Sequence, residues 1–147
     1  MKNKLPDTRT SIHTFLALAS LLLVSLAGTA HAAACPEVRL SNVQPGRGSV
    51  MLSVWGSSDS FFKKPLLAKK LAATEATLVI ALCGAEAPEI AVTVYQDLND
   101  NGKLDSNFLG IPSEPTAASG KPPKFKAPDW ESTRVPVQAG QAIDIRL

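Results

Sequence analysis

Histidine is almost missing from this chain of 147 residues, and the two that occur, His13 and His31, both lie near the N-terminus. Without that segment, the chain cannot set an imidazole beside a serine or cysteine nucleophile, nor offer one to zinc or copper. Long apolar runs are also scarce. The longest, residues 15–28, would form about 21 Å of helix, whereas the hydrocarbon of a bilayer is about 30 Å thick. The sequence therefore speaks against a histidine-dependent enzyme and against a transmembrane span.

The N-terminal segment has the layout of a secretory signal peptide. Three basic residues precede the apolar run, and Ala-His-Ala at positions 30–32 supplies a small-residue cleavage site. We expect residues 1–32 to be removed and residues 33–147 to form a single domain in the periplasm or outside the cell. The segment takes with it three of the fifteen basic and one of the thirteen acidic residues, which leaves twelve of each. This balance gives no reason to expect nucleic acid as a partner.

Only two cysteines occur, Cys35 and Cys83. Because an exported chain enters an oxidising compartment, we expect them to form a disulfide. On the chain-entropy model such a long closed loop contributes about 4 kcal/mol. Two alternatives stay open. Cys35 follows three alanines and is a candidate for lipidation, although the large aliphatic residue usual in that motif is missing, and the two thiols could also remain free.

Short apolar-alternating runs separated by Gly, Pro, Asn and Asp predict an all-β domain. We expect six strands, at residues 37–43, 49–55, 76–83, 90–95, 133–138 and 142–147. The second has apolar residues on both faces, which is typical of a central strand, and Pro136 indicates an edge for the fifth. The predicted fold class is an antiparallel β-sandwich, immunoglobulin-like or transthyretin-like.

Two segments between these strands are less regular. Residues 63–73 carry three leucines and four lysines, and we expect either a short helix opened by Pro65 or a loop held by the aromatic pair before it. Its lysines indicate a solvated face, with a membrane-contacting helix as the alternative. Residues 110–130 form a long proline-rich loop, and loops of this length in compact domains are usually functional or disordered.

The clearest motif is the acidic loop that begins directly after the fourth expected strand. Oxygen-bearing residues alternate along it, and Gly102 stands where a calcium loop turns sharply. Numbered as an EF-hand, the loop provides ligands at positions one, three, five, seven and nine. The candidate calcium ligands are Asp97, Asn99 and Asn101 through side chains, Lys103 through its carbonyl, and Asp105 directly or through water.

The loop departs from an EF-hand at the twelfth position, where Phe108 replaces the bidentate carboxylate. A carboxylate from elsewhere, such as Glu114, would have to fold back to complete the shell. Without it, calcium affinity should be weak, about 0.1 to 1 mM. The alternative needs no metal, because Asn and Asp side chains can cap such a loop through Asx-turns.

The region from Ile90 to Trp130 resembles an uncharacterised family of exported bacterial proteins, domain of unknown function 2141. The resemblance rests on the apolar strand at 91–95, the acidic loop at 97–105, Leu-Gly-Ile-Pro-Ser-Glu at 109–114 and Pro-Pro-Lys-Phe-Lys-Ala-Pro at 122–128. It implies an exported, mostly β domain and brings no known reaction. The chain departs from the family pattern at Gln96, where histidine is frequent, and at residues 116–119, where a Gly-Phe-Ser-like turn is usual.

Three function classes follow from these features. The first is a non-enzymatic module that binds a protein or carbohydrate surface, with Trp130, Phe125 and Phe108 as contact aromatics unless they only pin the long loop. The second is a purely structural envelope protein without a metal. The third is a hydrolase that uses carboxylates as acid and base, for which Asp97, Asp105 and Glu114 are the candidates.

Overall fold

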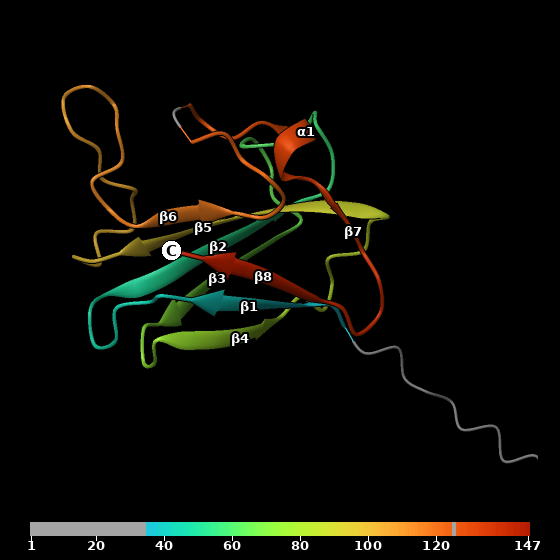
Figure 1. Cartoon of the computed structure of the whole chain (residues 1–147), viewed down its shortest axis with the longest axis horizontal. Helices are drawn as coiled ribbons and strands as arrows, with labels where there is room; N and C mark the ends of the chain where they lie inside the picture. Colours follow the sequence, from blue (N-terminus) through green and yellow to red (C-terminus); the bar gives the residue numbers. More distant parts are fainter. Residues whose placement is uncertain (1–34, 125) are drawn as a thin grey trace, which may run out of the picture. The chain divides into compact units, whose positions relative to one another are not determined.

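The computed structural model describes residues 35–124 and 126–147, and the expected signal peptide lies outside the described residues. The domain is almost entirely β-structure, with two sheets and one short helix (Figure 1). The strands are β1 Glu37–Ser41, β2 Ser49–Trp55, β3 Leu67–Ala72, β4 Thr77–Ala81, β5 Glu89–Asp97, β6 Thr116–Ala118, β7 Val135–Pro136 and β8 Ala142–Arg146, and the helix is α1 Trp130–Thr133.

The first sheet has the order β4-β1-β8, and the second has the order β3-β2-β5-β6 with β7 paired to β5. All pairings are antiparallel except the parallel pair of β1 and β8. The expected sandwich-like, mainly antiparallel architecture is confirmed. Strand β2 lies between β3 and β5, as its apolar residues on both faces predicted.

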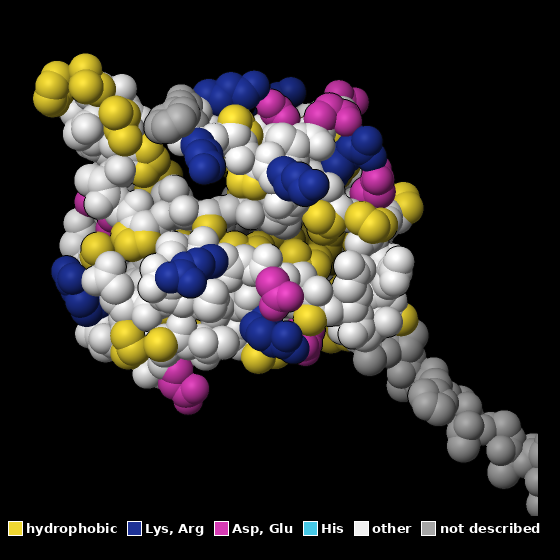
Figure 2. Space-filling view, in the orientation of Figure 1, with side chains coloured by type: hydrophobic (Ala, Val, Ile, Leu, Met, Phe, Trp, Pro, Cys, Tyr) yellow, Lys and Arg dark blue, Asp and Glu magenta, His cyan; other side chains and the backbone are white. Residues whose placement is uncertain are grey.

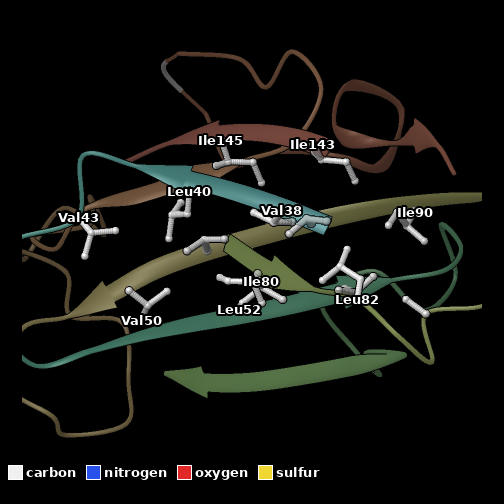
Figure 3. Close-up of a cluster of buried hydrophobic side chains, with 14 of the residues drawn as sticks. Val38, Leu40, Val43, Val50, Leu52, Ile80, Leu82, Ile90, Ile143 and Ile145 are labelled. Carbon is white, nitrogen blue, oxygen red and sulfur yellow. The ribbon is translucent and has the colours of Figure 1, made fainter. Parts of the chain in front are cut away.

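Side chains from both sheets fill the space between them (Figure 3). One set comes from β1, β4 and β8, including Leu40, Ile80 and Ile145, and the other from β2 and β5, including Leu52 and Ile90. All five are at most 4% exposed. The alternation of apolar residues that predicted these strands is therefore the alternation between core and solvent.

Strand β3 corrects the expectation of a helix or a loop at residues 63–73. Its residues pair with β2 from Ser49 to Val54, and its inward positions, Leu67, Lys69 and Leu71, are half-buried while the intervening ones are exposed. The two leucines four residues apart fit a strand of period two as well as a helix. Pairing with the free edge of β2 favours the strand over the helix, because it satisfies the backbone donors and acceptors of both segments.

The long proline-rich loop is more structured than predicted, whereas the fifth expected strand is shorter. Residues Thr116–Ala118 form β6 along β5, and the expected strand at 133–138 is reduced to β7 after the single turn α1. Asp129 caps that turn by accepting a hydrogen bond from the Ser132 N–H. Hydrogen bonds from Ser132 and the nearby Lys126 lower the pKa of Asp129 to about 2.

The two cysteines are bonded to each other. Their sulfurs are 2.11 Å apart and their Cα atoms 5.1 Å apart, and the sequence separation of the two residues is 48. The bridge ties the start of the domain to the segment after β4, where the Leu82 N–H also donates to the Pro36 carbonyl. None of the helices in the described part of the chain is long and apolar enough to cross a membrane.

Candidate functional site

The acidic loop begins at the buried end of β5. Asp97 is fully buried, and its carboxylate accepts hydrogen bonds from the N–H groups of Asn101, at 3.1 Å, and Gly102, at 2.7 Å. The first expected calcium ligand therefore already closes the turn on itself. Gly102 has φ +78, a conformation that residues with a Cβ adopt at a cost.

The two asparagines form successive Asx-turns. Asn99 Oδ1 accepts from the Asn101 N–H at 3.1 Å, and Asn101 Oδ1 accepts from the Lys103 N–H at 2.8 Å. Their amide groups point the other way, toward Asp105. Asn99 Nδ2 donates to one carboxylate oxygen of Asp105 at 2.7 Å, and Asn101 Nδ2 lies 3.1 and 3.0 Å from its two oxygens. The structure thus brings four expected ligand residues, Asp97 included, into one cage.

Glu114 returns to this cage from the far end of the loop. It is 7% exposed, and its two oxygens accept hydrogen bonds from the Leu98 N–H at 2.8 Å and the Asp105 N–H at 3.0 Å. It therefore joins the two ends of the nine-residue motif through their backbones. Glu114 therefore does fold back to the acidic loop, and its carboxylate contacts backbone N–H groups there.

The pKa values of two side chains beside the cage are shifted. Burial, and then the negative charges of Asp97 and Glu114, raise the pKa of Tyr95, whose hydroxyl donates to the Gly102 carbonyl at 3.4 Å. Asp100 accepts a hydrogen bond from the Ser49 hydroxyl at 2.6 Å and lies 3.3 Å from Lys70 Nζ. The Ser49 hydrogen bond and Lys70 lower the Asp100 pKa.

The base of the loop is locked against the turn between β1 and β2. Gln96 is fully buried, and its amide donates to the carbonyls of Gln44 and Arg47 and accepts from the Gln44 N–H. A Cβ on Gly48 would lie 1.8 Å from the Asp97 carbonyl oxygen. The sequence marked Gln96 only as a departure from the family pattern and did not reveal these contacts.

Beyond the cage, residues 105–113 double back as a narrow extension. The Ser113 N–H donates to the Asp105 carbonyl, and Ser106 and Pro112 form a β-bridge. At its end, Phe108 is 95%, Leu109 67% and Ile111 56% exposed. Figure 2 shows hydrophobic side chains gathered at the projecting end of the loop between β5 and β6. We call residues 106–113 the apolar tip.

The other expected contact aromatics behave differently. Trp130 packs edge-on against Phe61, with ring centroids 6.2 Å apart, and Phe61 in turn packs against Trp55. Trp130 therefore helps to hold α1 against the loop after β2. Phe125 lies outside the described residues. Of the two aromatics that the structure describes, Phe108 is the one exposed to solvent.

The donor set of the cage suits calcium only after a rearrangement. Both Asx amide oxygens accept backbone N–H groups, while the amide nitrogens face Asp105, so these amides would have to turn to offer oxygens to a cation. Within residues 35–124 and 126–147, no three His, Cys, Asp or Glu side chains are grouped to hold a metal ion. The possible oxygen ligands in the cage are the carboxylates of Asp97 and Asp105, the amides of Asn99 and Asn101, and the carbonyl of Lys103.

Open hollows lie away from the acidic loop. One, of about 270 Å³, is on the outer face of the first sheet beside Arg39 and Asp144, and another, of about 360 Å³, lies beside Ser57 and Lys64. Neither is lined by a residue of the cage. The three carboxylates proposed for a hydrolase each accept two or more hydrogen bonds from the loop itself, rather than facing a cleft.

A small β-sandwich whose central strand runs into a self-capped acidic loop is the class of protein defined by this fold and site. The family model of uncharacterised proteins conserved in bacteria, DUF2141, matches residues 38–145. The chain belongs to this family, which confirms the resemblance seen in the sequence, and the match includes the acidic loop and both sheets. Searches of curated proteins and of solved structures found no match.

Proposed function

We propose that this protein is an exported, non-enzymatic binding module that contacts its partner through the apolar tip. The observation that carries the proposal is the exposure of Phe108, Leu109 and Ile111 at the end of a loop whose base is held by the cage. Exposed apolar side chains gathered on a projecting element are typical of interaction sites. The acidic residues serve to hold the tip in place.

Export and the absence of a reaction are parts of the same proposal. Export is supported by the signal-like N-terminus and by the disulfide between Cys35 and Cys83, which persists in oxidising compartments. A non-enzymatic role is supported by the hydrogen bonds that already occupy the cage carboxylates, and by the lack of histidine after residue 31. A carboxylate that is fixed by the backbone is poorly placed to transfer protons to a substrate.

The test places a photo-activated cross-linking amino acid at position 108 and, as a control, at Ser58, which is exposed on the loop after β2. Both variants are expressed in a bacterial host and irradiated in intact cells. We expect an adduct from position 108 and none from position 58. A purely structural protein that needs no partner at the tip would give no adduct at either position, and equal labelling of both would also refute the proposal.

A second candidate function, calcium stabilisation of the loop, is favoured by one specific observation. The side chains of Asp97, Asn99, Asn101 and Asp105 all lie within one or two hydrogen bonds of each other, with the Lys103 carbonyl in the same loop. If the amides turn, these groups offer the oxygen ligands that calcium prefers. The cation would replace the amide–carboxylate bonds and neutralise Asp105.

Thermal unfolding with calcium or with a chelator tests this candidate. For a dissociation constant of about 1 mM, about 10 mM calcium stabilises the folded state by about 1.4 kcal/mol, or about 6 °C. The shift should vanish in Asp105→Asn and persist in Glu75→Gln, which alters an exposed carboxylate outside the loop. The same melting temperature with calcium and with chelator would favour a loop ordered only by its own hydrogen bonds.

A further inference from the structure

Several backbone N–H groups of the apolar tip find their acceptors within the tip itself. The Leu109 and Ile111 N–H groups both donate to Asn107 Oδ1, at 3.0 and 3.1 Å, and the Gly110 N–H donates to the Asn107 carbonyl at 2.9 Å. The Asn107 N–H donates to the Ile111 carbonyl at 2.9 Å. Four N–H groups of the tip, those of Asn107, Leu109, Gly110 and Ile111, therefore have acceptors within the tip itself.

This pattern discriminates between kinds of partner. A carbohydrate is recognised largely by hydrogen bonds, for which the tip has few unpaired donors. In a bilayer the opposite property is favourable, because a backbone group that enters the hydrocarbon must find its hydrogen-bond partner within the protein. The side chains agree, since Phe108, Leu109 and Ile111 carry no polar atom and a convex group of this kind needs no matching pocket in a bilayer.

The distribution of charged residues around the tip also favours a lipid partner. Residues 106–113, Ser-Asn-Phe-Leu-Gly-Ile-Pro-Ser, contain no charged side chain. Of the charged residues next to them, Glu114 is buried and Asp105 is bonded to two amides, whereas Lys103 is exposed. A membrane approached by the tip would therefore meet uncharged, apolar side chains first.

We propose that the apolar tip inserts into the interfacial layer of a lipid bilayer and so holds the exported protein at a membrane surface. The inference rests on the proposed binding function and names its partner. Phe108 and Leu109 enter the boundary between headgroups and acyl chains, where aromatic and aliphatic side chains are favourably placed. The cage stays at headgroup level and fixes the angle of entry, with Lys103 available to a phosphate.

The experiment uses the purified, disulfide-bonded protein and vesicles of phosphatidylcholine, alone or mixed with phosphatidylglycerol. We expect co-sedimentation with both, and a blue shift of the added tryptophan fluorescence in Phe108→Trp on mixing. In Val79→Trp, a matched control at a site that is 61% exposed on β4, the fluorescence should not change. A triple serine variant at positions 108, 109 and 111 should lose at least about tenfold in partitioning, since burial of even one such side chain is worth more than the about 1.4 kcal/mol of a tenfold change.

Three results would overturn the inference: no binding to either vesicle, equal binding by the triple serine variant, or equal shifts in the two tryptophan variants. Binding that requires phosphatidylglycerol and survives the serine substitutions would indicate adsorption through lysines. The vesicle experiment can fail without refuting the proposed binding function. Protein adducts from the cross-linker at position 108, together with no vesicle binding, would keep the binding module and reject the membrane as its partner.

Discussion

Removing the Glu114 carboxylate should loosen the acidic loop at both ends. In Glu114→Ala the N–H groups of Leu98 and Asp105 lose their acceptors, and both lie in partly buried positions. A hydrogen bond to a charged group contributes about 1.5 to 3 kcal/mol, and the lower value suits donors that water can partly reach. Two such bonds give about 3 kcal/mol, or about 12 °C in melting temperature for a domain of this size.

Glu114→Gln refines the test, because the amide keeps one acceptor oxygen and presents an N–H group to the second donor. About half of the destabilisation should remain. Chemical denaturation gives the free energy of unfolding, and hydrogen exchange measured by NMR reports the Leu98 and Asp105 amides directly. Both amides should exchange faster in the alanine variant, whereas amides in β1 should change only with global stability. Glu75→Gln serves as the exposed control.

The same measurements, made in chelator, separate two roles of Glu114. If its carboxylate ties the loop through the backbone, the loss of stability is the same with and without calcium. A melting temperature within about 1 °C of the unmodified protein in chelator would refute the hydrogen-bond reasoning, since two lost charged bonds must cost more. A loss that appears only with calcium would identify Glu114 as a ligand in the metal shell.

Two further predictions concern the base of the loop and the helix cap. Gly48→Ala should lower the free energy of unfolding by more than about 3 kcal/mol, because its Cβ would lie 1.8 Å from the Asp97 carbonyl oxygen. Gly46→Ala, at φ +71 with nothing within 4 Å, should lose only the about 1 to 2 kcal/mol of its backbone conformation. Equal losses of the two variants in urea unfolding would contradict the contact at Gly48. Asp129, with a pKa lowered to about 2 chiefly by the Ser132 hydrogen bonds, stabilises the fold above its ordinary pKa, and this contribution is lost as the pH falls from about 4 to 2, because the unfolded chain takes up the proton first. Over that range the unfolding midpoint should fall more steeply than in Asp129→Asn, and parallel pH curves would show that the cap carries no such linkage.

The strands that form the core could be predicted because each alternates between a buried and an exposed face. Val38 and Leu40, or Ile143 and Ile145, stand two positions apart, and a helix with one apolar face would point the two members of a pair to different sides. Strand β3 could not be separated from a helix in this way. Strand β6 was missed because Thr116–Ala118 carries small side chains and is defined by its partner, residues 93–95 of β5.

In the candidate site, the local contacts could be predicted from the sequence and the distant contacts could not. The bonds of Asn99 and Asn101 to N–H groups two residues ahead follow from the spacing, since short polar side chains reach that far in a turn. Glu114 bonds the Leu98 N–H across sixteen positions, and Gln96 reaches Gln44 across fifty-two. No spacing fixes such contacts, because they form only once β5 is paired with β6 on one side and with β2 on the other.

These distant contacts also bear on how the tip could bind. A free loop that closes on a partner loses conformational entropy at each ordered side chain and backbone segment, and this loss is subtracted from the affinity. Here Glu114 closes the loop and Gln96 fixes the turn that packs against its base, so that cost is met when the domain folds. Weakening the cage with Glu114→Gln should therefore reduce binding at Phe108 without touching a contact residue, whereas a loop that binds only by its exposed apolar area would keep its affinity.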